Sequence, residues 1–105
     1  MEQPNLSYIK SMSGGDEGFE QKLIGIIKSE FPVEKETYVN AVAEQNHKAT
    51  AEIVHKLKHK ISILGLVKSY DVAVEYEHNL TEGSTEGQEN FEAILKRITE
   101  YLETL

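Results

Sequence analysis

Apolar residues recur along most of the chain with a period near 3.6, a pattern that predicts a series of amphipathic helices. Prolines stand only at positions 4 and 32, and glycines gather mainly in 13–18, in 81–87 and at Gly65. Between these breaks we expect helices over residues 5–12, from Asp16 to about Phe31, from Pro32 to about Asn46, over 48–64, from Leu66 to about Leu80, and from about Gln88 to the end.

Several residues predict where these helices begin and end. Asn5 and Asp16 are expected N-caps, and Thr85 with Gln88 has the spacing of a capping box. Pro32 is expected to stop one helix and begin the next, and Gly65 to end another. Outside the 48–64 segment, the side chains expected to face the core are Leu6, Ile9, Met12, Phe19, Leu23, Ile26, Ile27, Phe31, Tyr38, Val39, Val42, Leu66, Tyr70, Ala73, Leu80, Phe91, Ile94, Leu95, Ile98, Leu102 and Leu105.

The expected fold class is all-α. Strand-like alternation is absent and the connections are short, which favours an antiparallel four-helix bundle with a short extra N-terminal helix. A chain of 105 residues suits one domain, so we assign residues 1–105 to a single helical unit. Met1 and the compact ends favour a free-standing protein over a piece of a larger one.

Composition narrows the function classes. The formal charge of −7 argues against nonspecific nucleic-acid binding. The chain has no cysteine, which excludes disulfides and thiolate chemistry. No apolar run approaches the roughly 18 residues of a membrane span, and the N-terminus lacks the features of a secretion signal. We therefore expect a cytoplasmic protein without a membrane anchor.

The segment 48–64 separates two kinds of side chain when its residues are placed about 100° apart around a helix. One face is apolar and is formed by Thr50, Ile53, Val54, Leu57, Ile61 and Leu64. The other face carries His55, Lys58, His59 and Ser62. His55 is therefore expected in water near the middle of the helix, with one ring nitrogen free at pH 7 to act as a nucleophile or ligand.

Three of the eleven basic residues fall at positions 56, 58 and 60, in a chain that is otherwise acidic. Such a patch suits an acidic partner, and its ammonium groups can reach a phosphoryl group on His55. A lysine-rich solvated face is the simplest alternative. A second alternative is a metal site at His55 and His59, with Glu52 on the same side; neighbouring lysines and the absence of an HEXXH pattern oppose it. His47 and His78 have no evident partner.

The segment "HKLKHKISILGL", residues 55–66, resembles the signature of histidine-containing phosphotransfer (HPt) domains, usually written H-x-L-K-G with a second glycine ten residues after the histidine. His55, Leu57, Lys58 and Gly65 occupy those places. The preceding stretch "NLSYIKSMSGGDEGFEQKLIGIIKSEFP" also resembles the N-terminal half of such domains, so the likeness covers about residues 5–80.

The resemblance implies a phosphocarrier that relays a phosphoryl group between receiver-domain aspartates in a multistep two-component phosphorelay, without ATP-dependent kinase activity of its own. His55 would be the phosphoacceptor and Lys58 would steady the phosphoryl oxygens. The partners would be response-regulator receiver domains, including the receiver of a hybrid histidine kinase, and would contact Ala51, Lys56, His59 and Ser62. The domain needs no cofactor or metal of its own, because the receiver supplies Mg²⁺.

One position departs from the family pattern. His59 stands where the signature has a glycine, so an imidazole projects toward the side from which a receiver would approach. This substitution is compatible with unchanged phosphotransfer, with selection among receiver partners, or with loss of phosphotransfer. In the last case the chain would be an interaction module that binds a receiver without taking phosphate.

Overall fold

The computed structural model describes residues 2–105 and confirms the all-α class. Its helices are α1 (Ser7–Ser13), α2 (Glu17–Ala43), α3 (His47–Ile63), α4 (Val67–Thr81) and α5 (Gln88–Glu103). The four long helices run alternately up and down along the molecule, which measures 44 × 23 × 19 Å. None of the described helices is both long and apolar enough to cross a membrane.

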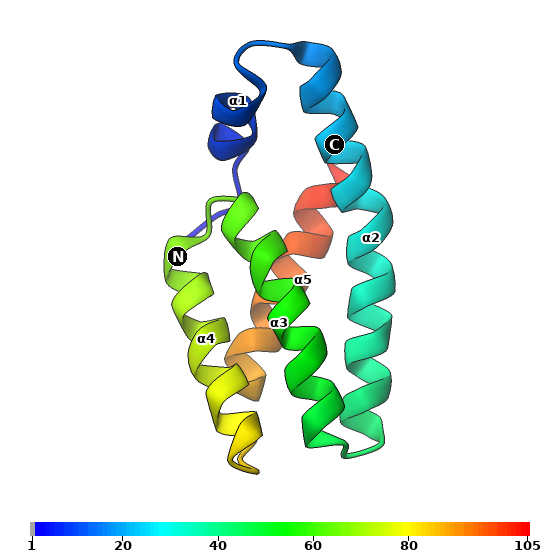
Figure 1. Cartoon of the computed structure of the whole chain (residues 1–105), viewed down its shortest axis with the longest axis vertical. Coiled ribbons are helices and arrows are strands. Elements are labelled where there is room, and N and C mark those ends of the chain that lie inside the picture. The colour runs from blue at the N-terminus through cyan, green and yellow to red at the C-terminus, as the bar shows by residue number, and fades with distance from the viewer. Residues whose placement is uncertain (1) are drawn as a thin grey trace.

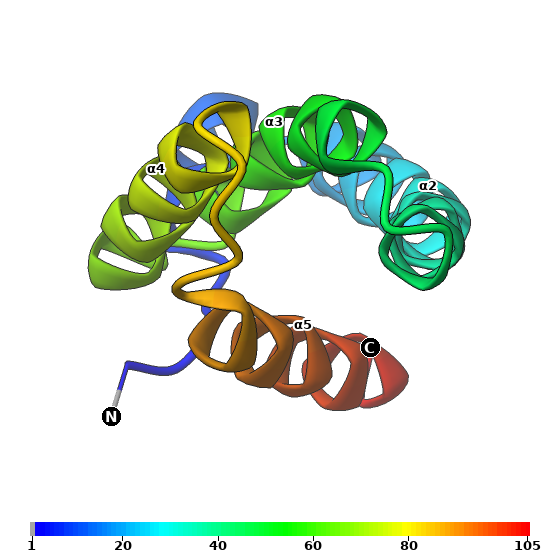
Figure 2. The ribbon, with the colours of Figure 1, turned by 90° about the horizontal axis from the view of Figure 1, so that it is seen from below.

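Helix α3 is the middle element of a curved row (Figure 2). Helices α2 and α4 flank it on either side, and α5 packs across the concave face of the row. The short α1 sits at the end where α2 begins (Figure 1). Because α3 has a neighbour on each side and α5 beneath it, only one strip of its surface is left to face solvent.

The core follows the apolar stripes that the sequence predicts on α3, α4 and α5. Val54, Leu57 and Ile61 of α3 are completely buried, as are Leu66 and Ile98. A polar link crosses this core: the hydroxyl of Tyr38 lies 2.9 Å from that of Tyr76 and donates to Oε2 of Glu92 at 2.9 Å. Burial of Tyr38 raises the pKa of its hydroxyl, which therefore remains a donor that joins α2, α4 and α5.

The expectation that Pro32 separates two helices is wrong, because α2 is continuous from Glu17 to Ala43. A proline inside a helix costs roughly 3 kcal/mol through a lost hydrogen bond and a steric clash. Here Phe31 and Tyr38 are each 1% exposed on a single stripe that crosses the proline. Burying two large aromatic side chains yields about 1.5–3 kcal/mol each, enough to offset that cost.

Continuity of α2 also changes which side chains face inward. Ile24, Ile27, Phe31, Tyr38 and Ala41 form its buried stripe, whereas Phe19, Ile26 and Val39, expected in the core, are 43%, 41% and 53% exposed. Val39 follows Tyr38 by one residue and so points about 100° away from it. Met12 and Leu105, also expected to be buried, are exposed at the ends of the bundle.

The helix ends match the predictions in part. Asp16 caps α2 by accepting from the Phe19 amide at 3.1 Å, and Gly65 follows α3 with a φ of +77°. The prediction that Asn5 is the N-cap of the first helix is wrong: α1 begins at Ser7 with Leu6 in the N-cap position, and the Asn5 side chain accepts from the Ser7 amide at 3.0 Å. The capping box at Thr85 and Gln88 is wrong: Gly87, with a φ of +97°, precedes α5 and no side chain caps it.

Candidate functional site

The outward face of α3 is fixed by its buried face. Asn46 caps the helix by accepting from the Ala49 amide at 3.0 Å, and the chain turns away at Gly65. Val54 and Leu57, the neighbours of His55 on the inner side, have no exposed surface. Because both ends of α3 are fixed and its inner face is buried, the rotation of the helix about its axis is also fixed. The His55 side chain therefore points outward, with 54% of its surface exposed.

The His55 ring is held by a carboxylate that comes from α4. Nδ1 of His55 lies 3.0 Å from Oε2 of Glu77, and the other oxygen of the same carboxylate, Oε1, accepts from Nζ of Lys58 at 2.9 Å. Partial burial alone would raise the pKa of Glu77, but the hydrogen bonds from Lys58 and His55 outweigh it and hold that pKa below its usual value. Glu77 is therefore ionised at neutral pH.

An ionised carboxylate only accepts hydrogen bonds. The ring nitrogen that faces Glu77 must therefore carry the hydrogen, so Nδ1 is the protonated nitrogen of neutral His55. In this tautomer Nε2 has a free lone pair. The site thus presents an oriented imidazole whose outer nitrogen is able to attack an electrophile or bind a cation.

The lysines near His55 do not form the open positive patch that the sequence suggests. Lys58 is only 12% exposed, pairs with Glu77 and lies 5.8 Å from the centroid of the Tyr70 ring. Lys60 turns the other way, toward α2, and pairs with Glu30 at 2.9 Å and with Glu34 at 3.3 Å. Burial would lower the pKa of Lys60, but these two carboxylates raise it, so it stays charged.

Lys56 is the exposed member of the three, and no carboxylate among residues 2–105 lies within ion-pair distance of it. Two of the three predicted ammonium groups are thus already compensated by neighbouring helices. The charge contrast that the sequence suggests for this face is much reduced in the folded protein.

The remaining predicted residues surround His55 at different depths. His59 is exposed one turn further along α3, its ring centroid 5.2 Å from that of His55 and the two rings almost perpendicular. Ser62 is exposed beyond it. Ala51 is only 8% exposed. It belongs to the wall of a hollow of about 680 Å³ between α3 and α4, which His55, Lys56 and Glu77 also line.

A closed metal centre does not form around these histidines. Within residues 2–105 no three histidine, aspartate or glutamate side chains are grouped so as to hold an ion. His47 is the first residue of α3 and lies about two turns before His55. His78 has no evident partner in the sequence, but its Nε2 lies 3.4 Å from the carboxylate of Glu82, the residue that follows α4.

Sequence reasoning missed Glu77, although a signal for it exists. The inward stripe of α4 includes Tyr70, Ala73 and Leu80, and Glu77 occupies the next place in that spacing, four residues after Ala73 and three before Leu80. A carboxylate in a position that faces other helices normally has a cationic or hydrogen-bonding partner. The partners, Lys58 and His55, are 19 and 22 residues away in sequence and meet it only because α3 and α4 pack together.

Comparisons with family models, with curated proteins and with solved structures found no match to this chain. The function must therefore be argued from the geometry of the site and from the signature in the sequence.

Proposed function

We propose that this protein is a histidine phosphotransfer protein that accepts a phosphoryl group on Nε2 of His55 from a receiver-domain aspartate and passes it to the aspartate of another receiver. The observation that carries this proposal is the pairing of an exposed His55 with Glu77 at 3.0 Å, which leaves Nε2 as the free nucleophile. The HPt-like signature around His55 supports the same function from the sequence.

The transfer step balances without an external acid or base. The lone pair on Nε2 attacks phosphorus in line as the bond from phosphorus to the aspartate oxygen breaks, and the receiver's carboxylate leaves with that electron pair. The ring keeps its hydrogen on Nδ1 and becomes positively charged. Glu77, already ionised, stabilises this charge through the existing hydrogen bond. Passing the group on reverses each step.

The domain supplies the nucleophile and its orientation, whereas the receiver supplies the acidic pocket and Mg²⁺. On this proposal the domain itself would need no cofactor or metal. Transfer of this kind is expected in the cytoplasm, where response-regulator receivers act, with no role for nucleic acid or membrane. Lys58 would act on the acceptor through Glu77, the group that it contacts.

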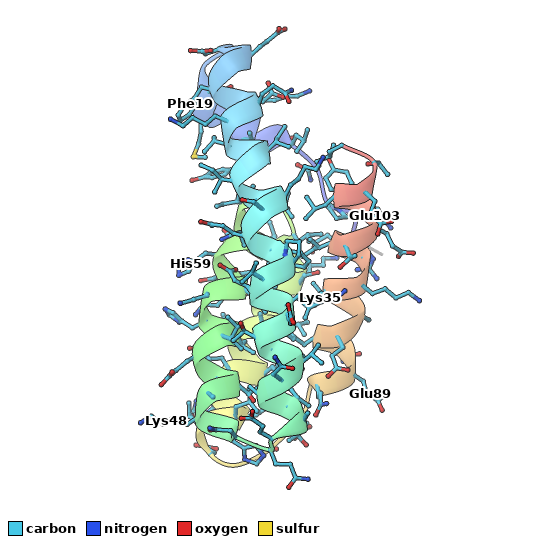
Figure 3. All side chains as sticks on the ribbon, turned by 90° about the vertical axis from the view of Figure 1, so that its right-hand side faces the viewer. Phe19, Lys35, Lys48, His59, Glu89 and Glu103 are labelled. Atoms are coloured by element: carbon cyan, nitrogen blue, oxygen red, sulfur yellow. The ribbon has the colours of Figure 1, made fainter. Side chains whose placement is uncertain are left out.

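The helix that flanks α3 also carries a surface that suits a protein partner. Phe19, Ile26 and Val33 are spaced i, i+7 and i+14 on α2 and are 43%, 41% and 63% exposed, so they form a solvent-facing apolar stripe. In Figure 3, Phe19 and His59 project from the same side of the molecule. An exposed apolar stripe of this kind is a common feature of docking surfaces.

The experiment is incubation with a ³²P-labelled phosphoreceiver, followed by detection of protein phosphate that is labile in acid and stable in base. Wild type and His59→Gln should take up label, and His55→Gln should not. Label that persists in His55→Gln would remove the proposed acceptor. A wild-type domain that binds phosphoreceiver but never takes up label would be an interaction module, and the phosphotransfer proposal would then be wrong.

A further inference from the structure

We propose that His59, and not Lys58, provides the hydrogen bond that holds the phosphoryl group on His55. This inference rests on the proposed function and specifies how the phosphorylated state is stabilised. It assigns a role to the residue that departs from the HPt signature, and it changes the role that the signature implies for Lys58.

Lys58 is already engaged on the wrong side of the ring. Its ammonium shares the Glu77 carboxylate with Nδ1 of His55, at 2.9 Å from Oε1, and its side chain is 12% exposed. A phosphoryl group would be attached to Nε2, the nitrogen that faces away from Glu77. To reach it, Lys58 would have to leave both the carboxylate and the Tyr70 ring, 5.8 Å away. Glu77 would then lose one of the two hydrogen bonds that lower its pKa.

The other two lysines do not replace it. Lys60 is paired with Glu30 and Glu34 on the α2 side of α3. Lys56 follows His55 by one residue, so its side chain leaves the helix about 100° away from that of His55. His59 follows by four residues and lies within about 40° of His55, one turn along the same strip.

His59 is placed and free to donate. Its ring centroid is 5.2 Å from that of His55. Among residues 2–105 it makes no hydrogen bond or ion pair, so turning it toward a bound group breaks neither. A phosphoryl group on Nε2 of His55 extends outward from the ring and brings three acceptor oxygens toward this neighbour. An N–H donor on an imidazole suits such oxygens, and a protonated imidazole suits them better.

The carboxylates near His59 are paired with other residues. From α2, Glu30 and Glu34 are held by Lys60; from α4, Glu77 is held by Lys58 and His55. On α3 itself, Glu52 is exposed two turns before His59, and Lys56 and Ser62 are exposed at closer positions. The imidazole of His59 can therefore turn toward the phosphoryl oxygens without leaving a carboxylate partner.

The experiment measures how long phosphate stays on His55. Wild type, His59→Gly, His59→Arg and Lys58→Gln are phosphorylated chemically with phosphoramidate, and the loss of phosphohistidine is followed by ³¹P NMR at one fixed pH, with His55→Gln as background. His59→Gly restores the residue of the HPt signature. Because the intrinsic acid lability of phosphohistidine is common to all variants, the ratio of lifetimes isolates the contribution of His59.

We expect wild-type phosphohistidine to outlast that of His59→Gly about three-fold, the size of an exposed polar pair. His59→Arg should restore the long lifetime, and Lys58→Gln should keep the advantage of wild type. Equal lifetimes of wild type and His59→Gly, or loss of the advantage in Lys58→Gln with its retention in His59→Gly, would overturn the assignment. If phosphorylated His55 forms chemically but exchanges with no receiver, the proposed function fails while the His59 result stands.

Discussion

Replacing Glu77 by glutamine is expected to destabilise the fold as well as to alter the site. Glu77 accepts hydrogen bonds from Lys58 at 2.9 Å and from His55 at 3.0 Å. Exposed ion pairs contribute about 0.2–1 kcal/mol and hydrogen bonds to charged groups about 1.5–3 kcal/mol. The side chains of Lys58 and Glu77 are 12% and 23% exposed, which places their pair between these limits. Glutamine keeps one acceptor oxygen and loses the charge, so the unfolding free energy should fall by about 1–2 kcal/mol.

The pH dependence of this loss has a definite sign. The folded-state pKa of Glu77 lies below its ordinary value of 4.5, so its contribution to stability is fully present above that pH. The contribution is lost as the pH falls through the lowered folded-state pKa, because both states are then protonated. The difference between wild type and Glu77→Gln should therefore be large at pH 7 and should shrink as the pH falls below 4.5.

The assay is urea unfolding followed by circular dichroism at 222 nm, at pH 7 and at the lowest pH where wild type remains folded. In thermal unfolding of the same variants, each kcal/mol of lost unfolding free energy corresponds to a decrease of about 4–8 °C in the melting temperature of a domain of this size. Glu75→Gln is the matched control, since Glu75 is an exposed α4 glutamate with no ion pair among residues 2–105. Equal stability of the two variants at pH 7, or a Glu77→Gln loss that persists undiminished at low pH, would refute the reasoning.

Three further predictions, two of them with a control substitution, test how α3 is held. Leu57→Ala should cost about 2–5 kcal/mol by urea unfolding, because Leu57 is fully buried, whereas Val67→Ala, at a side chain 71% exposed, should cost less than about 0.5 kcal/mol. Gly65→Ala should lower the melting temperature, because φ is +77° and the added Cβ would lie 2.6 Å from the Asn5 side chain; adding Asn5→Gly should recover only the steric part. Asn46→Ala should cost about 1 kcal/mol by removing the N-cap, measurable by the same unfolding assay.

The exposed and buried faces of α3 were predictable because they depend on a single helix. Once residues 48–64 are helical, a turn of about 100° per residue places Val54 and Leu57 inside and His55 outside. Which residues of α3 share a face depends only on the geometry of that helix, and the packing of α2, α4 and α5 around α3 does not change it. The same reasoning holds for the apolar stripe of α5.

The course of α2 was not predictable, because it depends on a balance between local and tertiary terms. Pro32 favours a helix end by local chemistry, and only the joint burial of Phe31 and Tyr38 in one core shows that the helix continues. The error over Val39 follows from it, since a helix restarting at Pro32 need not keep the register that places Tyr38 inside. Local signals alone do not weigh these terms.

Only the part of the candidate site that lies on α3 was predictable from the sequence. His55 and its exposure come from one helix, whereas the carboxylate that orients it comes from another. The lysines were predicted as a free positive patch because their partners, Glu30, Glu34 and Glu77, lie on α2 and α4. Ion pairs between helices appear only when the helices are placed, and here they determine which cations remain able to meet a phosphoryl group.

The central claim is that Nε2 of His55 is the nucleophile because Glu77 holds the hydrogen on Nδ1. Long-range ¹H–¹⁵N NMR of the histidine-labelled protein, recorded before and after incubation with a phosphoreceiver, tests it directly. We predict that His55 starts as the Nδ1–H tautomer and acquires a phosphorus coupling at Nε2. Phosphorus on Nδ1, on another histidine, or on none of the histidines would contradict the account.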